Sequence, residues 1–139
     1  GILTRLPVWN TSSAKEELKD RNVLTVKINA ANELLVEGNR GQIRNLRKRT
    51  VEFIQNPERL KTLAESPKTA VISLQNDRKT SYETYIAVYN ELKAAHTQLH
   101  SKRAKQLYGK EFGQLSIANQ KEIKKAIPLL ISEAEPTEH

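Results

Sequence analysis

The segment VLTVKI at residues 23–28 alternates apolar and polar side chains, and it constrains the fold more than any other part of the sequence. In an extended backbone, Leu24, Val26 and Ile28 point to one side, and the threonine and lysine between them point to the other. Such a strand is buried on one face only. We therefore expect a sheet that is covered on that face by helices.

Further strand and helix patterns give the order β-β-α-β-α-(α)-β. Periods of two and of 3.6 residues distinguish strands from helices, and Pro57 and Pro128 mark two helix ends. The sequence predicts an α+β fold, in which a small mixed β-sheet carries helices packed on one face. The expected elements are strands at 24–28 and 34–36, a helix at 41–56, a strand at 69–75, helices at 81–107 and 116–126, and a strand at 129–131.

Length and composition limit the classes of protein to consider. A chain of 139 residues suits one domain with a modest two-layer core. The absence of cysteine excludes disulfides, thiolate metal sites and cysteine nucleophiles. A formal net charge of +7 points to anionic surroundings such as nucleic acid, lipid headgroups or cell-wall polymer. No apolar run approaches the ~20 residues that span a bilayer.

The polar stretch SLQNDRKTSYETY joins the third strand to the long helix. As catalysts, Asp77 and Arg78 would need a partnered nucleophile or base, and the sequence offers none nearby. Thr80 and Glu83 have the T-x-x-E spacing of a capping box, and Tyr82 suits packing at the helix start. We interpret Asp77, Thr80, Tyr82 and Glu83 as a structural strand–helix joint. We predict no catalytic residue and no enzymatic activity.

His96 and His100 stand four residues apart, a spacing that can hold a metal on one helix face. The motif HTQLH lacks the glutamate of zinc proteases. A catalytic zinc normally takes three protein ligands, and a third is missing here. We therefore expect no metal and no cofactor.

A cluster of cations accompanies the first predicted helix. It comprises Arg40, Arg44, Arg47, Lys48 and Arg49. These side chains could bind an anionic surface, or they could be the solvated back of an amphipathic helix. Aromatic residues interleaved with the cations, and the motifs of known nucleic-acid-binding folds, are absent. Nucleic acid is therefore not the expected partner.

Taken in order, LTVKINAANELLVEG, AVISLQNDRKTSYETYIAVYNELKAA and LLISEAEP resemble the periplasmic domain of the ExbD/TolR family of biopolymer transport proteins. The resemblance covers about residues 4–99 and 128–135 and is most similar to the Bacteroidota ExbD branch. About residues 100–127 replace a shorter link of the family, so we expect a helical insertion there. The matching positions are Leu24, Val26, Ile28, Asn29, Gly38, Asp77, Tyr82, Ile86, Val88 and Leu92.

The resemblance implies a subunit of a proton-motive-force-driven inner-membrane motor that energises TonB-dependent outer-membrane transport. It implies an ExbB-like membrane protein, a TonB-like protein and a second copy of the chain as partners. The family's proton-carrying aspartate lies in an upstream transmembrane helix, so Asp77 does not inherit that role. Two alternatives stay open: a TolR-like stator that contacts peptidoglycan, and a basic module that binds nucleic acid or other anions.

The implied layout has three parts: an extended tether at 1–21 that follows a transmembrane helix, the periplasmic domain at 22–135, and a tail at 136–139. The domain would lie on the periplasmic side of the inner membrane. An open sheet edge can accept a strand from a partner through backbone hydrogen bonds. The expected partner-binding residues are Leu6, Pro7 and Val8 in the tether and Leu129, Leu130 and Ile131 in the last strand.

Overall fold

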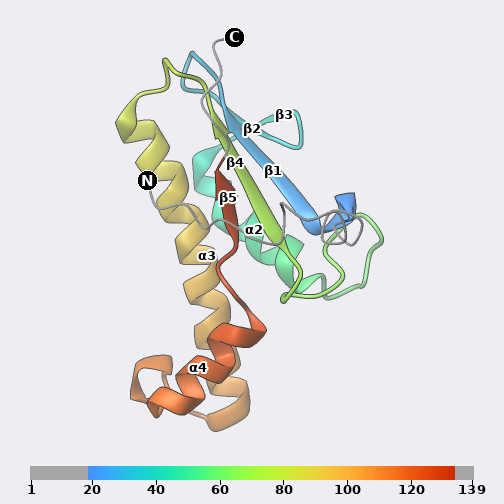
Figure 1. Cartoon of the computed structure of the whole chain (residues 1–139), viewed down its shortest axis with the longest axis vertical. Helices are drawn as coiled ribbons and strands as arrows, with labels where there is room; N and C mark the ends of the chain where they lie inside the picture. Colours follow the sequence, from blue (N-terminus) through green and yellow to red (C-terminus); the bar gives the residue numbers. More distant parts are fainter. Residues whose placement is uncertain (1–18, 134–139) are drawn as a thin grey trace, which may run out of the picture.

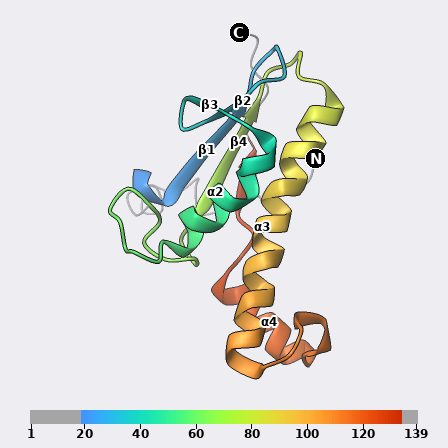
Figure 2. The same cartoon turned by 180° about the vertical axis from the view of Figure 1, so that it is seen from behind.

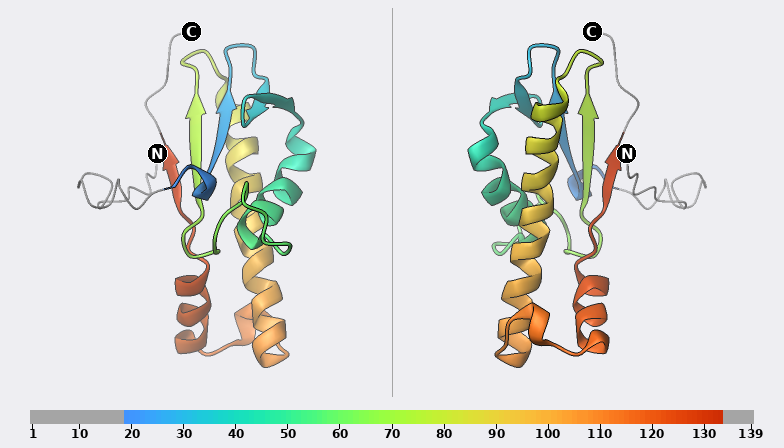
Figure 3. Two further views of the ribbon diagram at one scale, coloured as in Figure 1. Left: turned by 90° about the vertical axis from the view of Figure 1, so that its right-hand side faces the viewer. Right: turned by 90° about the vertical axis from the view of Figure 1, so that its left-hand side faces the viewer.

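The computed structural model describes residues 19–133, in which a five-stranded sheet is covered on one face by helices (Figure 1 and Figure 3). The strand order is β3-β2-β1-β4-β5. β1 is antiparallel to β2 and parallel to β4, which is in turn parallel to β5. This mixed sheet confirms the predicted α+β fold. The strands are β1 (Val23–Ile28), β2 (Leu34–Val36), β3 (Asn39–Gly41), β4 (Val71–Asn76) and β5 (Ile131–Glu133).

The alternation of β1 appears directly in its burial. Leu24, Val26 and Ile28 are buried on the face toward the helices, whereas the residues between them are only half-buried. Leu24 lies opposite Ile72 of β4, and Ile72 lies opposite Ile131 of β5. The inner face is thus a continuous aliphatic layer across the central and edge strands.

Two helices cover this layer, as the view from behind shows (Figure 2). α2 (Ile43–Gln55) contributes Leu46, Phe53 and Ile54, and α3 (Tyr82–Tyr108) contributes Val88, Leu92 and Leu99 to the same core. Their bounds lie within two residues of the predicted ones. α2 begins later than expected because residues 39–41 form a strand.

The sequence did not predict β3. This strand forms because a tight turn after β2 reverses the chain. Glu37 and Gly38 have φ values of 52° and 82°, so both central residues of the two-residue loop between β2 and β3 are left-handed. Such turns match the twist of a hairpin and favour glycine. All three β3 residues are exposed, so the strand carries no apolar alternation that the sequence could reveal.

The segment between α2 and β4 is an irregular loop fixed by two buried asparagines. Asn56 donates to the carbonyl oxygens of Leu60 (2.8 Å) and Ala64 (2.9 Å). Asn22, in the short 3-10 helix η2 (Asp20–Asn22), donates to the Glu65 carboxylate (2.9 Å) and accepts from the Glu65 amide (2.8 Å). Side chains thus replace the hydrogen bonds that a loop cannot make within itself.

Residues 100–127, called here the helical extension, project beyond the sheet (Figure 1 and Figure 3). They comprise the distal part of α3, the 3-10 helix η3 (Phe112–Gln114) and α4 (Ile117–Ala126). Ser116 caps α4 by accepting from the Asn119 amide (3.1 Å), as the sequence indicates. A separate small core of Ala104, Leu115 and Ile123, with Phe112 packed against it, holds the extension together. Among residues 19–133, no helix has the length and apolar content needed to cross a membrane.

Candidate functional site

The outer edge of β5 is the first candidate for a partner-binding site. This strand begins later than predicted. The sequence placed it at 129–131, but it runs from Ile131 to Glu133. The carbonyl of Ile127 contacts Nε2 of His100 (2.7 Å), which holds the chain beside α3. Leu129 packs against the core, and only at Leu130 does the chain reach β4, where the Ile72 amide donates to its carbonyl (2.9 Å).

The hydrogen bond between Ile72 and Leu130 fixes which backbone groups point outward. In a strand, successive residues direct their N–H and C=O groups to opposite sides. Because Leu130 faces β4, Ile131 and Glu133 direct their amides and carbonyls away from it. Within residues 19–133, no strand pairs with that side of β5. Within that range, the edge therefore carries the outward backbone groups that strand addition requires.

The far end of β5 is fastened to α3 by a side-chain contact that the sequence did not reveal. The Tyr85 hydroxyl donates to the Glu133 carboxylate, and the Tyr85 ring stacks on Tyr89, with centroids 6.2 Å apart. Burial, followed by the hydrogen bond to Glu133, raises the pKa of Tyr85. The two residues lie 48 positions apart, and no local pattern in the sequence links them. Only the fold brings them together.

The opposite edge, β3, is less open to pairing. It is three exposed residues long, and Arg40 at its centre forms an ion pair with Glu33 (3.0 Å). Short, charged edge strands resist the addition of another strand. Of the two sheet edges, β5 is the better candidate for a partner strand. Leu6, Pro7 and Val8, the other predicted contacts, lie outside the described residues.

The predicted anionic-surface residues are all exposed on β3 and α2. They are Arg40, Arg44, Arg47, Lys48 and Arg49. Two of them are ion-paired, Arg40 as above and Arg47 with Glu91 of α3 (3.0 Å). The other three have no ion-pair partner within residues 19–133. Their positive charge is thus available to an external anion.

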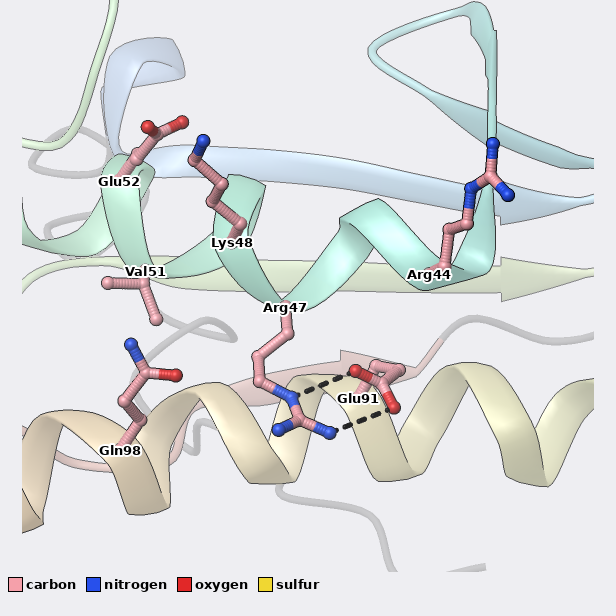
Figure 4. A pocket seen from close by; sticks show the side chains of 7 residues that line it. All are labelled: Arg44, Arg47, Lys48, Val51, Glu52, Glu91 and Gln98. Carbon is pink, nitrogen blue, oxygen red and sulfur yellow. Dashed lines mark hydrogen bonds and ion pairs between the residues drawn. The ribbon is translucent and has the colours of Figure 1, made fainter.

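A groove of about 530 Å³ runs between α2 and α3 beside these cations (Figure 4). Arg44, Arg47 and Lys48 line it together with Glu52 and Glu91. The two carboxylates offset part of the positive charge, so the groove is of mixed sign. Such a groove is better suited to a polymer whose negative charges are spread out than to a single compact anion.

The strand–helix joint has a different geometry from the one predicted. Ser81 caps α3 by accepting from the Thr84 amide (3.2 Å), so the predicted capping box of Thr80 and Glu83 is wrong. Thr80 Oγ1 instead lies 3.3 Å from the Ile28 carbonyl and 3.2 Å from that of the next residue, which fastens the joint to β1. The helix therefore begins one residue later than predicted. Glu83 is then no longer at the third helical position, from which its carboxylate could accept a hydrogen bond from the backbone amide of the N-cap residue.

The other two joint residues occupy opposite environments. Asp77 is buried, and its Oδ1 accepts from the Lys79 amide (2.9 Å) while its own amide donates to Ile28 (3.0 Å). Asp77 Oδ2 is also buried and has no hydrogen-bond partner within residues 19–133. Tyr82, expected to pack at the helix start, is 76% exposed. It is the first residue of α3, and its side chain faces solvent instead of the core.

The two histidines are tied to backbone carbonyls. Nδ1 of buried His96 lies 2.8 Å from the Leu92 oxygen, and burial lowers the pKa of this histidine. His100 contacts Ile127, as noted, and stacks on Phe112 with centroids 5.6 Å apart. Within residues 19–133, no group of three or more His, Cys, Asp or Glu side chains could hold a metal ion.

Comparison with known proteins places the chain in a family. The family model described as biopolymer transport protein ExbD/TolR matches residues 2–103, well over half of the chain. The matched region includes β1 to β4, α2 and most of α3, whereas η3, α4 and β5 follow it. Among curated proteins, none matches the sequence significantly. The chain therefore belongs to the ExbD/TolR family of biopolymer transport proteins.

Proposed function

We propose that this chain is the periplasmic domain of an ExbD-like subunit in a proton-motive-force-driven inner-membrane motor, and that it binds an extended segment of a TonB-like partner. The subunit would pair with an ExbB-like membrane protein through a transmembrane helix preceding the domain. Membership in a family of cell-envelope transport proteins supports this role. The open β5 edge is the observation that supports the mode of binding.

Strand addition explains how the domain could bind a partner with little demand on its sequence. A partner strand beside β5 would bond to the outward amides and carbonyls of Ile131 and Glu133. β5 is held from behind by its register with β4 and by the contact between Tyr85 and Glu133. A pre-ordered edge lowers the entropy cost of binding. The same edge could accept β5 of a second copy, which would give the expected homodimer.

A matched pair of variants isolates the outward backbone amide. Glu133→Pro and Glu133→Ala both remove the carboxylate that contacts Tyr85, but only proline removes the N–H. Proline is tolerated in edge strands where the amide faces solvent. We expect Glu133→Pro to bind the periplasmic fragment of the TonB-like protein from the same genome about fivefold more weakly than Glu133→Ala does. Isothermal titration calorimetry measures the difference.

The backbone amide shifts of the wild-type domain, followed by NMR during the same titration, locate the contact. Under the proposal, the amides of Ile131 and Glu133 shift and those of β3 do not. Equal affinities of the two variants, together with shifts that gather on α2, would contradict strand addition. A folded domain that binds no TonB-like fragment would contradict the ExbD-like role.

A TolR-like role in contact with anionic envelope polymer is the second candidate, favoured by the three α2 cations without an ion-pair partner. Arg44, Lys48 and Arg49 would engage the negative charges of peptidoglycan. Replacing all three with glutamine should abolish co-sedimentation of the domain with purified peptidoglycan, while Arg40→Gln should change it little. If the cations instead bound nucleic acid, affinity for DNA would exceed that for peptidoglycan and fall steeply with added salt.

A further inference from the structure

The far end of the helical extension exposes apolar side chains. Within residues 19–133, five large hydrophobic side chains are exposed, and three of them are here: Leu107 (52%), Tyr108 (39%) and Ile117 (66%). Leu107 and Tyr108 end α3, and Ile117 begins α4. Figure 3 shows that both of these helix ends lie in the part of the extension farthest from the sheet. The small core of the extension leaves these three side chains uncovered.

The helical extension that carries this tip is strongly basic along its length. Residues 100–127 contain seven lysines and arginines but only two acids, a net +5 within a chain of formal charge +7. All seven cations are exposed. Lys105 pairs with Glu111 (3.1 Å), and Lys124 lies over the Phe112 ring (5.8 Å). The other five, which have no ion-pair partner within residues 19–133, are Lys102, Arg103, Lys110, Lys121 and Lys125.

The topology fixes the direction in which the extension points. β1 and β5 are both parallel to β4, so the three strands begin at the same end of the sheet. α4 leads into β5, and residues 20–22 lead into β1, so the chain enters the domain at the end from which the extension projects (Figure 3). A membrane anchor upstream of residue 1, as the proposed function has it, would be joined to the domain at that end.

We infer that the tip of the helical extension binds the anionic phospholipid surface of the membrane that anchors the protein. Leu107, Tyr108 and Ile117 enter the headgroup region, and the cations of the extension contact lipid phosphates. Exposed apolar side chains on a lysine-rich helical element are the pattern of interfacial membrane binding, and tyrosine suits the boundary between apolar and aqueous layers. An acidic protein would account for the cations but would not require an apolar tip. The orientation, though not the lipid binding itself, rests on the proposed function.

Flotation of the whole 139-residue chain with lipid vesicles tests the apolar contribution. We expect at least about tenfold stronger partition onto vesicles of phosphatidylcholine mixed with phosphatidylglycerol than onto phosphatidylcholine alone. The triple variant Leu107→Ser, Tyr108→Ser, Ile117→Ser should bind the anionic vesicles at least about tenfold more weakly. Leu60→Ser, which replaces an exposed leucine of the α2–β4 loop, is the control and should bind as the wild type does.

A second pair of variants separates local charge from net charge. Lys110→Gln, Lys121→Gln, Lys125→Gln removes three cations of the extension, and Arg44→Gln, Lys48→Gln, Arg49→Gln removes three from α2. We expect the first to weaken partition by at least about tenfold and the second to change it little. Equal losses in the two triples would show attraction by net charge alone and overturn the inference. So would unchanged binding of the serine variant.

Two further results distinguish this inference from the proposed function. The glutamine and serine variants of the extension should still bind the TonB-like fragment, and Glu133→Pro should still bind vesicles. If the wild-type chain does not bind anionic vesicles but does bind polyglutamate, the inference is overturned in favour of an acidic protein partner. That result would leave the β5 proposal standing.

Discussion

The guanidinium of Arg47 on α2 donates two hydrogen bonds to the carboxylate of Glu91 on α3, from Nε to Oε1 at 3.0 Å and from Nη2 to Oε2 at 3.2 Å (Figure 4). This parallel geometry orients the two helices above the sheet. Both side chains remain in contact with water, because their exposed fractions are 49% and 24%. The pair thus fixes an orientation more than it contributes stability.

Arg47→Ala should therefore lower the melting temperature by no more than about 4 °C. The loss should shrink further in high salt, because salt screens exposed charges. Arg44→Ala, on the preceding turn of the same helix and without an ion-pair partner in the described range, is the control. Thermal unfolding followed by circular dichroism at low and high salt measures both. A much larger loss that persists in salt would mean that Arg47 acts through packing.

The cap of α3 gives a second prediction. Ser81 satisfies an amide of the first helical turn, so Ser81→Ala should cost about 1 kcal/mol of unfolding free energy. Glu83→Ala should change the free energy by less than about 0.5 kcal/mol, since no capping box forms. Urea unfolding of the two variants compares them directly. The reverse order of effects would mean that the helix is capped by Thr80 after all.

The third prediction concerns the loop between α2 and β4, to which Asn22 is hydrogen-bonded. Asn22→Ala removes two hydrogen bonds with Glu65 from a residue that is only 3% exposed. Because it leaves the Glu65 amide without its partner, the expected cost is about 1–3 kcal/mol. Lys19→Ala breaks only the exposed ion pair with the same carboxylate (2.9 Å) and should cost much less. Urea unfolding tests both; similar costs would show that the carboxylate and not the loop amide matters.

The central strand, the helices and the cap of α4 could be predicted because local patterns determine them. The alternation of apolar and polar residues in VLTVKI matches the burial in the structure, where Leu24, Val26 and Ile28 are the buried residues. Ser116 precedes an amphipathic stretch and caps it. In each case the physical cause lies within a few residues of its effect, so a single sequence is sufficient to recognise it.

The candidate site was harder to predict because its determinants are far apart in sequence. The start of β5 depends on where His100 holds Ile127, and its fastening depends on the contact between Tyr85 and Glu133. β3 has no buried side chain to mark it. The choice of Ser81 over Thr80 as cap depends on Thr80 reaching the end of β1, a contact across about 50 residues. None of these contacts has a local signature.

His96 gives the last prediction, a loss of stability at mildly acidic pH. Its side chain is 2% exposed, and burial, opposed by the hydrogen bond to Leu92, lowers the pKa below its ordinary value. The unfolded chain takes up a proton as the pH falls through about 6.5, whereas the folded protein keeps this imidazole neutral to lower pH. The unfolded state therefore binds more protons in that window. The unfolding free energy should fall as the pH drops from about 7.5 to about 5.5 and level off below the folded pKa.

Urea unfolding across this pH range, with the imidazole signal of His96 followed by NMR, measures both quantities. His96→Asn can place an amide nitrogen near the position of Nδ1 and still donate to Leu92, but it cannot titrate. The variant should show a flatter pH dependence between about 7.5 and about 5.5 than the wild type. An equally steep dependence in the variant, or an imidazole that titrates at its ordinary pKa in the folded protein, would assign the acid sensitivity to another group. The range lies above the titration of ordinary carboxylates, so their protonation contributes little to the comparison.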